Sequence, residues 1–422
     1  MASIRGMLDA VVIGAGHAGL VASHRLRAAG LEHVVLERGA VDESWRTQRW
    51  DSFVLNTATR MNGLPGGALD GADPDGFEGR DAWVARLEAY VREQGLPVRT
   101  HTTVTAVARD ERGFVVAAAG AAPIRARHLI VASGMVTAPK VPPLAADLDG
   151  RLASLTTGAY RRPEQLAPGG VLVVGSAQSG CQIAEELLDA GRDVYLATGT
   201  VGRLPRRLRG RDSLLWLTET GWFDQRPSDL PDPAIMRAAQ PMISGVGKRG
   251  HTVSLQSLAA RGATLLGRLV AASGTRLRFA PDLAEHLRWA DDWSRRIRAH
   301  VDEHIARSGL TAPSSESDPA DEPCDPGAFH APDELDLADR GITTVIFTTG
   351  FRADLSWLRV PGAVDDRGAP IQDEGRARID GLWFLGWAWL RHRKSGIIWG
   401  AAEDSAHVVG QIVAGVRPAA QR

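Results

Sequence analysis

The chain has 422 residues, of which 44% are hydrophobic and 23% charged, with a formal net charge of −1. This length predicts two or three domains, and the near-neutral charge argues against a surface for nucleic acid or an anionic membrane. No apolar run approaches the roughly 18 residues of a membrane span. Two cysteines, Cys181 and Cys324, form no C-x-x-C pattern, which excludes a disulfide scaffold and a cysteine zinc site. We therefore expect a cytoplasmic protein without metal, nucleic-acid or membrane partners.

The first predicted element is a buried strand over residues 8–13, followed by a glycine-rich turn and a helix that extends to about Ala29. The turn has the pattern G-x-G-x-x-G. Gly14 permits the tight turn, Gly16 lets the backbone approach a pyrophosphate, and Gly19 lets the helix pack on the strand. The first helical turn, with His17 and Ala18, offers free N–H groups to phosphates. The pattern predicts a site for an ADP-containing cofactor.

A second strand, His33–Leu36, ends at Glu37, where a carboxylate would accept hydrogen bonds from a ribose. Arg38 follows within the same turn. The alternative interpretation of the first motif is a purely structural glycine turn, but the strand–turn–helix context favours the nucleotide site.

Two tryptophans and several arginines lie in the segment 44–56, soon after the second strand. Trp45 and Trp50 could cover a cofactor, and the two arginines of the segment, Arg46 and Arg49, could contact its phosphates. A surface loop whose arginine stems cover apolar neighbours explains the composition about equally well.

Helical spacing over Asp81–Gln94 and three β signals follow, at Val98–Ala108, Phe114–Ala119 and Ile124–Val131. The last strand runs into Ser133 and Gly134. Several prolines after Gly134 and a turn at 147–150 indicate a domain boundary.

A second nucleotide signal begins with the buried strand 171–174 and continues into a helix that ends near Ala190. The turn between them is a G-x-A-x-x-G variant. The next strand, 193–196, leads to Thr198 and an arginine-rich stretch in place of a carboxylate. Because arginines pair with a 2′-phosphate that a carboxylate would repel, this pattern favours NADPH over NADH. A basic surface turn without a ligand is the alternative. The turn residues are Gly175, Ser176, Ala177, Gln178, Ser179 and Gly180, and the arginines that we assign to NADPH are Arg203, Arg206 and Arg207.

The next segment predicts a hairpin from Thr264–Val270 and Thr275–Phe279, then a long amphipathic helix from Leu283 to Ile305. Residues 311–333, rich in Pro, Asp, Glu and Ser, predict a loop or linker.

Two further buried strands are predicted near the C-terminus, Thr343–Phe347 before Gly350 and Leu382–Leu385 before Gly386. A basic run then precedes an apolar helix that we expect to begin at Gly396. Cations and a helix N-terminus favour negative charge there, such as the reduced pyrimidine edge of a flavin. A charged loop before an ordinary helix is the alternative.

These motifs together resemble the flavin-dependent monooxygenases and, more closely, the bacterial CzcO-like flavoproteins. The segments that carry the resemblance are Val35–Asn56, Val171–Glu186, Arg203–Asp212 and Arg393–Ile397. The resemblance implies an α/β fold with two Rossmann-like dinucleotide-binding domains. A discontinuous FAD domain would span 1–147 and 338–422, and an NADPH domain with a helical insertion would span 148–337.

The resemblance also implies roles for residues at matching positions. Asn56 would sit beside the flavin and help hold its oxygenated form, and Lys394 would face the pyrimidine edge. Val104 would contact the adenine through its backbone. The remaining FAD contacts would come from Gly14, Gly16, His17, Ala18, Gly19, Glu37, Arg38, Trp45, Arg46, Trp50, Ser133, Gly134, Gly350, Gly386, Ser395, Gly396 and Ile397.

The sequence departs from the monooxygenase fingerprint F-x-G-x-x-x-H-x-x-x-Y between the two domains. Tyr160 fits the last position, but Thr156 replaces the histidine, Gly150 the phenylalanine and Leu152 the first glycine. That histidine is linked to NADPH handling in the family.

We expect an FAD- and NADPH-dependent monooxygenase that transfers one oxygen atom of O2 through a 4a-hydroperoxyflavin to nitrogen, sulfur or activated carbon. The alternative is an NADPH-dependent flavin reductase or dehydrogenase, which the Thr156 departure favours. A nucleotide-sensing protein without catalysis is a third alternative. Trp387, Trp389 and Trp399 suggest an apolar or aromatic substrate, and a homodimer is compatible with the sequence.

Overall fold

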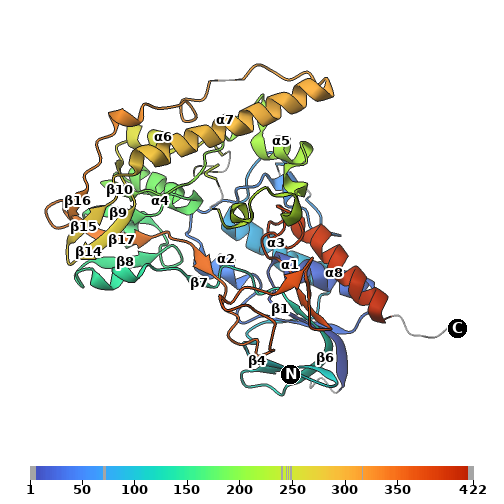
Figure 1. The fold of residues 1–422 in the computed structure, drawn as a ribbon. Helices are drawn as coiled ribbons and strands as arrows, with labels where there is room; N and C mark the ends of the chain where they lie inside the picture. Colours follow the sequence, from blue (N-terminus) through green and yellow to red (C-terminus); the bar gives the residue numbers. More distant parts are fainter. Residues whose placement is uncertain are drawn as a thin grey trace.

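Two mainly parallel β-sheets organise the chain in the computed structural model, one in the lower and one in the upper half of the molecule (Figure 1). The structure describes residues 6–69, 73–238, 241–243, 245, 247, 250–315 and 317–416. Within these residues, no helix is both long and apolar enough to cross a membrane.

The first sheet takes its strands from both ends of the chain. Its order is β19-β20-β21-β6-β1-β2-β3, and the five strands from β21 to β3 run parallel. Because β1 is central, helices and loops cover both of its faces, which explains its nearly continuous apolar sequence. The bounds are β1 Met7–Ile13, β2 His33–Leu36, β3 Val98–Arg99, β6 Ile124–Val131, β19 Gln372–Asp373, β20 Arg376–Ala377 and β21 Leu382–Phe384.

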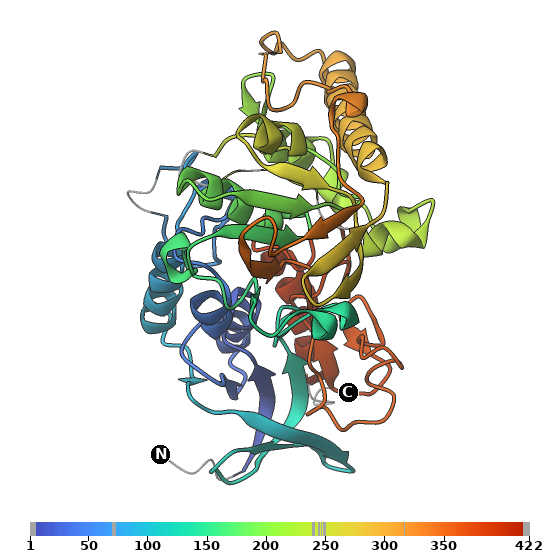
Figure 2. The ribbon, with the colours of Figure 1, turned by 90° about the vertical axis from the view of Figure 1, so that its left-hand side faces the viewer.

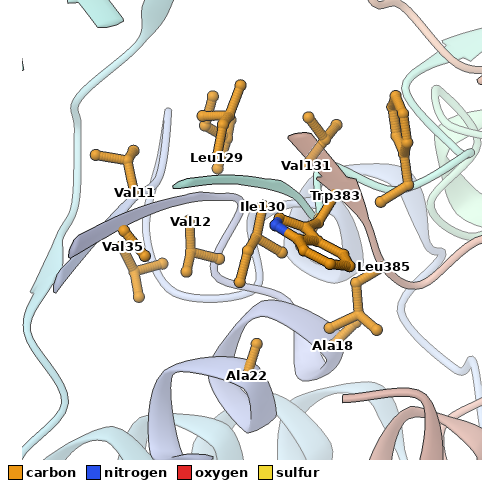
Figure 3. Close-up of a cluster of buried hydrophobic side chains, with 14 of the residues drawn as sticks. Val11, Val12, Ala18, Ala22, Val35, Leu129, Ile130, Val131, Trp383 and Leu385 are labelled. Atoms are coloured by element: carbon orange, nitrogen blue, oxygen red, sulfur yellow. The ribbon is translucent and has the colours of Figure 1, made fainter. Parts of the chain in front are cut away.

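Helix α1 (His17–Ala28) packs beneath this sheet and carries α8 (Gly400–Val416) on its other side. Figure 3 shows Ala18 and Ala22 of α1 close below Val12, Ile130 and other strand residues. The guanidinium group of Arg25 joins the two helices by donating to the carbonyl of Ala402 at 2.9 Å. The small side chains on α1 allow the close approach of helix and sheet that a nucleotide-binding turn requires.

Two helices and a pair of strands also belong to the first half of the fold. The helices are α2 (Glu43–Gln48) and α3 (Arg80–Glu93), and β4 (Val104–Asp110) pairs antiparallel with β5 (Gly113–Ala118), which extends onto β6. The predicted strand 98–108 is therefore divided into β3 and β4 by a loop at 100–103.

The second sheet is entirely parallel, with the order β13-β10-β9-β17-β8. Strand β17 carries residues 342–347, which the predicted boundary at 338 assigned to the first domain, yet it pairs with β9 and β8 in the second sheet. The bounds are β8 Ala153–Thr156, β9 Gly170–Val174, α4 Gln178–Asp189, β10 Val194–Ala197, β13 Thr264–Leu266 and β17 Ile342–Phe347.

The predicted hairpin at 264–279 proves to be two structures. Residues 264–266 form β13 of the parallel sheet, whereas β14 (Leu269–Ser273) and β15 (Arg276–Phe279) form the hairpin, with β16 (Glu334–Asp336) at its edge. The long helix α7 (Leu283–Ser308) crosses the top of the molecule in Figure 1.

The remaining short elements lie around and between the two sheets. Figure 2 shows the stacked arrangement of the two sheets from the side. The bounds are β7 Ala138–Pro139, β11 Arg207–Leu208, β12 Arg211–Asp212, α5 Ser213–Glu219, η4 Trp222–Asp224, α6 Leu255–Ala260 and β18 Phe351–Arg352.

Candidate functional site

The two glycine-rich turns have the same backbone geometry. Gly14 and Gly175 both adopt φ of +108°, a region that side chains disfavour. A Cβ atom at Gly14 would lie 2.4 Å from the carbonyl oxygen of Ala132, and one at Gly175 would lie 2.9 Å from that of Thr348. Only glycine fits at these positions, because the neighbouring strand passes directly beside each turn.

The last glycine of each motif brings helix and strand together. A Cβ atom at Gly19 would lie 2.0 Å from the carbonyl oxygen of Gly14, and one at Gly180 would lie 1.9 Å from that of Gly175. At Gly16 the nearest protein atom to such a Cβ is 3.5 Å away, on Asp42. The protein itself therefore does not require glycine at 16, which fits a position kept open for the close approach of a ligand.

A groove begins beside the first turn with a cavity of about 450 Å³. The predicted residues Glu37, Arg38 and Val104 line it together with Ser133. Trp357 lines it as well, and no sequence signal pointed to that residue. Asp354, Ser356 and Arg359 also line it, and the sequence did not predict them.

Glu37 is buried at the end of β2, as its predicted ribose-binding role requires. Its carboxylate accepts hydrogen bonds from the backbone N–H of Ala15 at 2.7 Å and of Gly39 at 3.3 Å. Burial raises the pKa of Glu37, and these two N–H groups oppose the increase. A carboxylate has about four acceptor sites, so Glu37 can still accept further hydrogen bonds from a hydroxyl group.

The groove continues over the first turn into a cavity of about 180 Å³ that shares Gly14, Glu37, Arg38 and Ser133 with the first. The structure thus brings together the predicted residues of four separate segments. They are Gly16, His17, Ala18, Trp45, Arg49, Gly134, Gly386 and Gly396, joined by the unpredicted Asp42 and Met135.

Three side chains in this cavity have unusual electrostatics because they are buried. Burial lowers the pKa of His17 to about 4, raises that of Asp42 to about 8 and lowers that of Arg49 to about 10. His17 is therefore neutral near pH 7, and Arg49 is the cation of the group.

Three buried polar atoms in the groove have no hydrogen-bond partner within the described part of the chain, namely His17 Nε2, Asp42 Oδ2 and Ser133 Oγ. Unpaired buried polar atoms are costly. Together with the open backbone at Gly16, they fit a groove that holds a polar, phosphate-containing ligand such as a dinucleotide.

Some of the aromatic and basic residues of segment 44–56 line the groove in the structure, and others do not. Trp45 lines the groove, but Arg46 donates to Glu88 at 2.6 Å and is not among the residues that line it. Trp50 is 1% exposed and packs edge-on against Phe53 in the core. Arg49 is the arginine that reaches the groove. The composition of the segment did not distinguish the two arginines, and the family resemblance pointed to Arg46.

The arginines assigned to NADPH are mostly engaged elsewhere. The guanidinium group of Arg203 is buried between Asp291 at 2.5 Å and Asp321 at 2.7 Å. Arg206 is buried against Asp212 and donates to the backbone carbonyl of Asn56 at 2.8 Å. These two assignments are corrected, because acidic partners on α7, the 311–333 loop and β12 occupy both side chains.

Two neighbouring predicted contacts differ in accessibility. Thr198 is also buried, where its hydroxyl group bonds the carbonyl of Leu266 and the ring of His286. Arg207 is exposed, with no ion pair to any described residue. Within the second turn, Ser176 accepts a hydrogen bond from the N–H of Gly199 and thereby fixes the loop after β10.

The basic run near the C-terminus is anchored by ion pairs. Lys394 contacts Asp224 at 2.6 Å and Glu403 at 2.7 Å. Burial opposes the charged form of Lys394, but the two carboxylates outweigh it and raise its pKa. Helix α8 begins at Gly400 and not at the predicted Gly396. The helix N-terminus is therefore displaced from the groove, and the ammonium group of Lys394 has two protein partners.

The other predicted residues of this region either line one of two cavities or accept hydrogen bonds from backbone N–H groups. The hydroxyl group of Ser395 accepts from the N–H groups of Arg391 and His392, which stabilises the turn. Gly396 lines the groove, whereas the next residue, Ile397, lines a separate apolar cavity. Gly350 adopts φ of +86° after β17 and accepts from the N–H of Lys140.

The apolar cavity has a volume of about 200 Å³ and lies where the two dinucleotide-binding halves meet. Asn56 comes from the first half, and Gln178 is the first residue of α4 in the second fingerprint. Trp399 lines the cavity, but Trp387 and Trp389 do not line it and are buried in the surrounding structure. The remaining walls are Thr57, Leu204, Leu214, Leu217, Trp222, Phe223, Pro241, Ile243, Trp293, Ile297, Arg393 and Ile397.

Two parallel sheets with matching glycine turns, a polar groove and an adjoining apolar cavity define an oxidoreductase fold with two dinucleotide-binding halves. The model of the pyridine nucleotide-disulphide oxidoreductase family matches residues 11–209. The predicted fold class is confirmed.

Relatives match the chain over different shares of its length. The chain is 26% identical over 412 residues to a CzcO-like oxidoreductase of Geobacillus kaustophilus, covering 96% of this chain and 99% of the relative. It is 30% identical over 246 residues to indole-3-pyruvate monooxygenase YUCCA1 of Oryza sativa subsp. japonica, covering 57% and 60%. The structure of a flavin-containing monooxygenase from Stenotrophomonas maltophilia covers 97% of this chain and 99% of its own with a TM-score of 0.66 at 20% identity. The predicted resemblance to the CzcO-like proteins is confirmed, and the chain is an oxidoreductase.

Proposed function

We propose that this protein is an FAD- and NADPH-dependent monooxygenase that oxidises a small apolar organic molecule. The observation that carries the proposal is that the groove, the second fingerprint and the apolar cavity lie next to one another. The groove over the first fingerprint ends at Gly396, the second fingerprint contributes Gln178, and the apolar cavity lies between them beside Asn56.

FAD would lie in the groove, with its ribose near Glu37 and its pyrophosphate over Gly16, where Arg49 supplies positive charge. NADPH would bind at the second turn. When bound, FAD supplies hydride acceptance from NADPH and the subsequent reaction of the reduced ring with O2.

The side chains around the cavity exclude water and position the reacting molecule. The walls are mainly leucine, isoleucine, tryptophan and phenylalanine, and a dry site protects reactive oxygen species from hydrolysis and decay. Asn56 is one of the few polar residues in these walls. Its side-chain oxygen accepts from Gln182 at 3.3 Å, which orients the amide and leaves its N–H groups without a partner among the described residues. The amide can then donate to an oxygen atom in the cavity.

The relatives support this choice in part. The rice relative is a monooxygenase by name, and so is the Stenotrophomonas maltophilia protein of the same fold. A simple NADPH-dependent reductase is the second candidate, because Thr156 occupies the fingerprint position of the histidine. Thr156 is the last residue of β8 and pairs with Phe347 of β17, so it lies at the strand ends of the second sheet where a nucleotide is expected.

Single-turnover kinetics test the proposal. The purified protein is reduced anaerobically with NADPH and mixed with O2, while absorbance and released hydrogen peroxide are measured. A monooxygenase should reoxidise in two phases and, with substrate, release much less than one equivalent of peroxide. A single fast phase with stoichiometric peroxide in every condition would favour the reductase, and a protein that binds no flavin would refute both.

A further inference from the structure

Arg393 is the only charged residue among the described residues that line the apolar cavity. It lies in the loop between β21 and α8, two residues after Arg391 and directly before Lys394. Both of these neighbours face carboxylates. Arg391 lies 3.8 Å from Glu374, and Lys394 lies 2.6 Å from Asp224.

The guanidinium group of Arg393, by contrast, has no carboxylate within ion-pair distance in the described part of the chain. It is held by stacking and by one hydrogen bond. Its Cζ atom lies 4.5 Å from the ring centroid of Trp222 and 4.7 Å from that of Trp389, and its Nε donates to Gln225 Oε1 at 3.0 Å. The two terminal nitrogens remain available.

This half-buried cation has no negative partner of its own among the described residues. Burial lowers the pKa of Arg393 to about 10, so the group is still charged near pH 7. The two aromatic rings offset part of the cost, but they cannot satisfy the terminal N–H groups, which match the geometry of a carboxylate. The indole Nε1 of Trp293, another wall residue, is also buried without a hydrogen-bond partner among the described residues.

We propose that the cavity binds an aromatic monocarboxylate whose carboxylate pairs with Arg393 and whose ring lies among Trp222, Phe223 and Trp399. This inference rests on the proposed function in that it names the substrate class of the same site. An apolar cavity of about 150 Å³ accommodates benzene, so one of about 200 Å³ suits a single aromatic ring with a short acidic chain. A single cation with no acidic wall residue favours one negative charge over two.

Calorimetric titration of the oxidised holoprotein, without NADPH, tests the proposal. The probes are benzoate, phenylacetate and 3-phenylpropionate, each compared with its primary amide, which has a similar shape and no charge. We expect at least one acid to bind about tenfold or more tightly than its amide, since charge-assisted hydrogen bonds exceed neutral ones by this amount.

Three variants separate the role of Arg393 from its contribution to folding. Arg393→Gln should remove the preference for the acid and leave binding of the amide nearly unchanged. Arg393→Lys should restore part of the preference. Arg226→Gln is the matched control, because Arg226 is exposed and pairs with Glu374 outside the cavity, and it should behave as the parent protein does.

The proposal is overturned if no acid binds more tightly than its amide, or if Arg393→Gln keeps the full preference. Because neither NADPH nor oxygen takes part, this result is independent of the oxygenation test. A preference for the acid combined with single-phase reoxidation would refute the monooxygenase and retain the carboxylate site.

Discussion

Replacement of Arg203 by methionine distinguishes a structural arginine from a nucleotide-binding one. Methionine keeps an unbranched side chain but removes the cation that joins Asp291 on α7 to Asp321 in the 311–333 loop. Both carboxylates are buried. Asp321 would retain Arg298, whereas Asp291 would retain, among the residues that the structure describes, only a long hydrogen bond of 3.3 Å from the N–H of Cys324.

The expected loss of stability follows from these contacts. Two unit charges about 4 Å apart attract by about 4 kcal/mol at an effective dielectric constant near 20. Desolvation cancels much of that attraction in the intact pair, but removal of one partner from a buried pair costs about 3–5 kcal/mol. Because Arg298 still compensates Asp321, we expect a value near the lower limit, about 3 kcal/mol.

The assay combines thermal unfolding, followed by circular dichroism, with NADPH kinetics below the unfolding transition. Arg203→Met should lower the Tm and leave the KM for NADPH within about twofold of the parent. Loss of an arginine that contacts the nucleotide directly would raise this KM by a larger factor. Arg207→Met is the matched control. It should leave stability within about 0.5 kcal/mol, as at other exposed positions, and raise the KM for NADPH more than that for NADH. If Arg203→Met keeps its Tm and raises the KM for NADPH, the structural interpretation is refuted.

Three further outcomes are expected. Gly14→Ala should purify without flavin absorbance and with a lower Tm, because its Cβ would lie 2.4 Å from the carbonyl oxygen of Ala132. Normal flavin content in this variant would contradict the conclusion that only glycine fits at this turn. Burial raises the pKa of Asp42 to about 8, so the folded protein holds a proton that the unfolded chain releases at lower pH. The protonated carboxyl therefore favours the folded state, and this contribution to the free energy of unfolding is lost as the pH rises from about 4 to 8. Asp42→Asn should flatten that part of the stability profile, measured by urea unfolding, and an unchanged slope would exclude Asp42 as its source. Asn56→Ala should leave flavin reduction by NADPH unchanged and increase the share of hydrogen peroxide released; a change confined to the reduction rate would place Asn56 on the nucleotide side instead.

Local sequence patterns were sufficient for the parts of the fold that short-range physics controls. The strand of residues 8–13, the turn at Gly14 and the helix that follows were predicted correctly, and so was the second fingerprint at Gly175. These predictions succeed because each glycine is required by contacts within one strand–turn–helix unit and the strand beside it. The resemblance to the CzcO-like proteins rests on the second fingerprint and on further short segments such as Val35–Asn56 and Arg393–Ile397.

Pairings between distant segments were beyond what the sequence could show. Arg203 has the composition expected of a phosphate contact, yet its partners lie 88 and 118 residues away. Strand β17 falls within the range that the resemblance assigned to the first domain, but its hydrogen bonds place it in the second sheet. A local pattern does not encode such partners, because they depend on which elements the fold brings together.

The sequence by itself thus determined that the chain has two dinucleotide-binding turns and where each begins. Only the tertiary structure decided which charged side chains are available to a ligand. Arg203 and Arg206 are neutralised by buried carboxylates, whereas Arg49 reaches the groove and Arg393 reaches the apolar cavity. The physical reason is that a buried cation must find an anion, and whether that anion belongs to the protein or to a ligand depends on the packing of segments far apart in the chain.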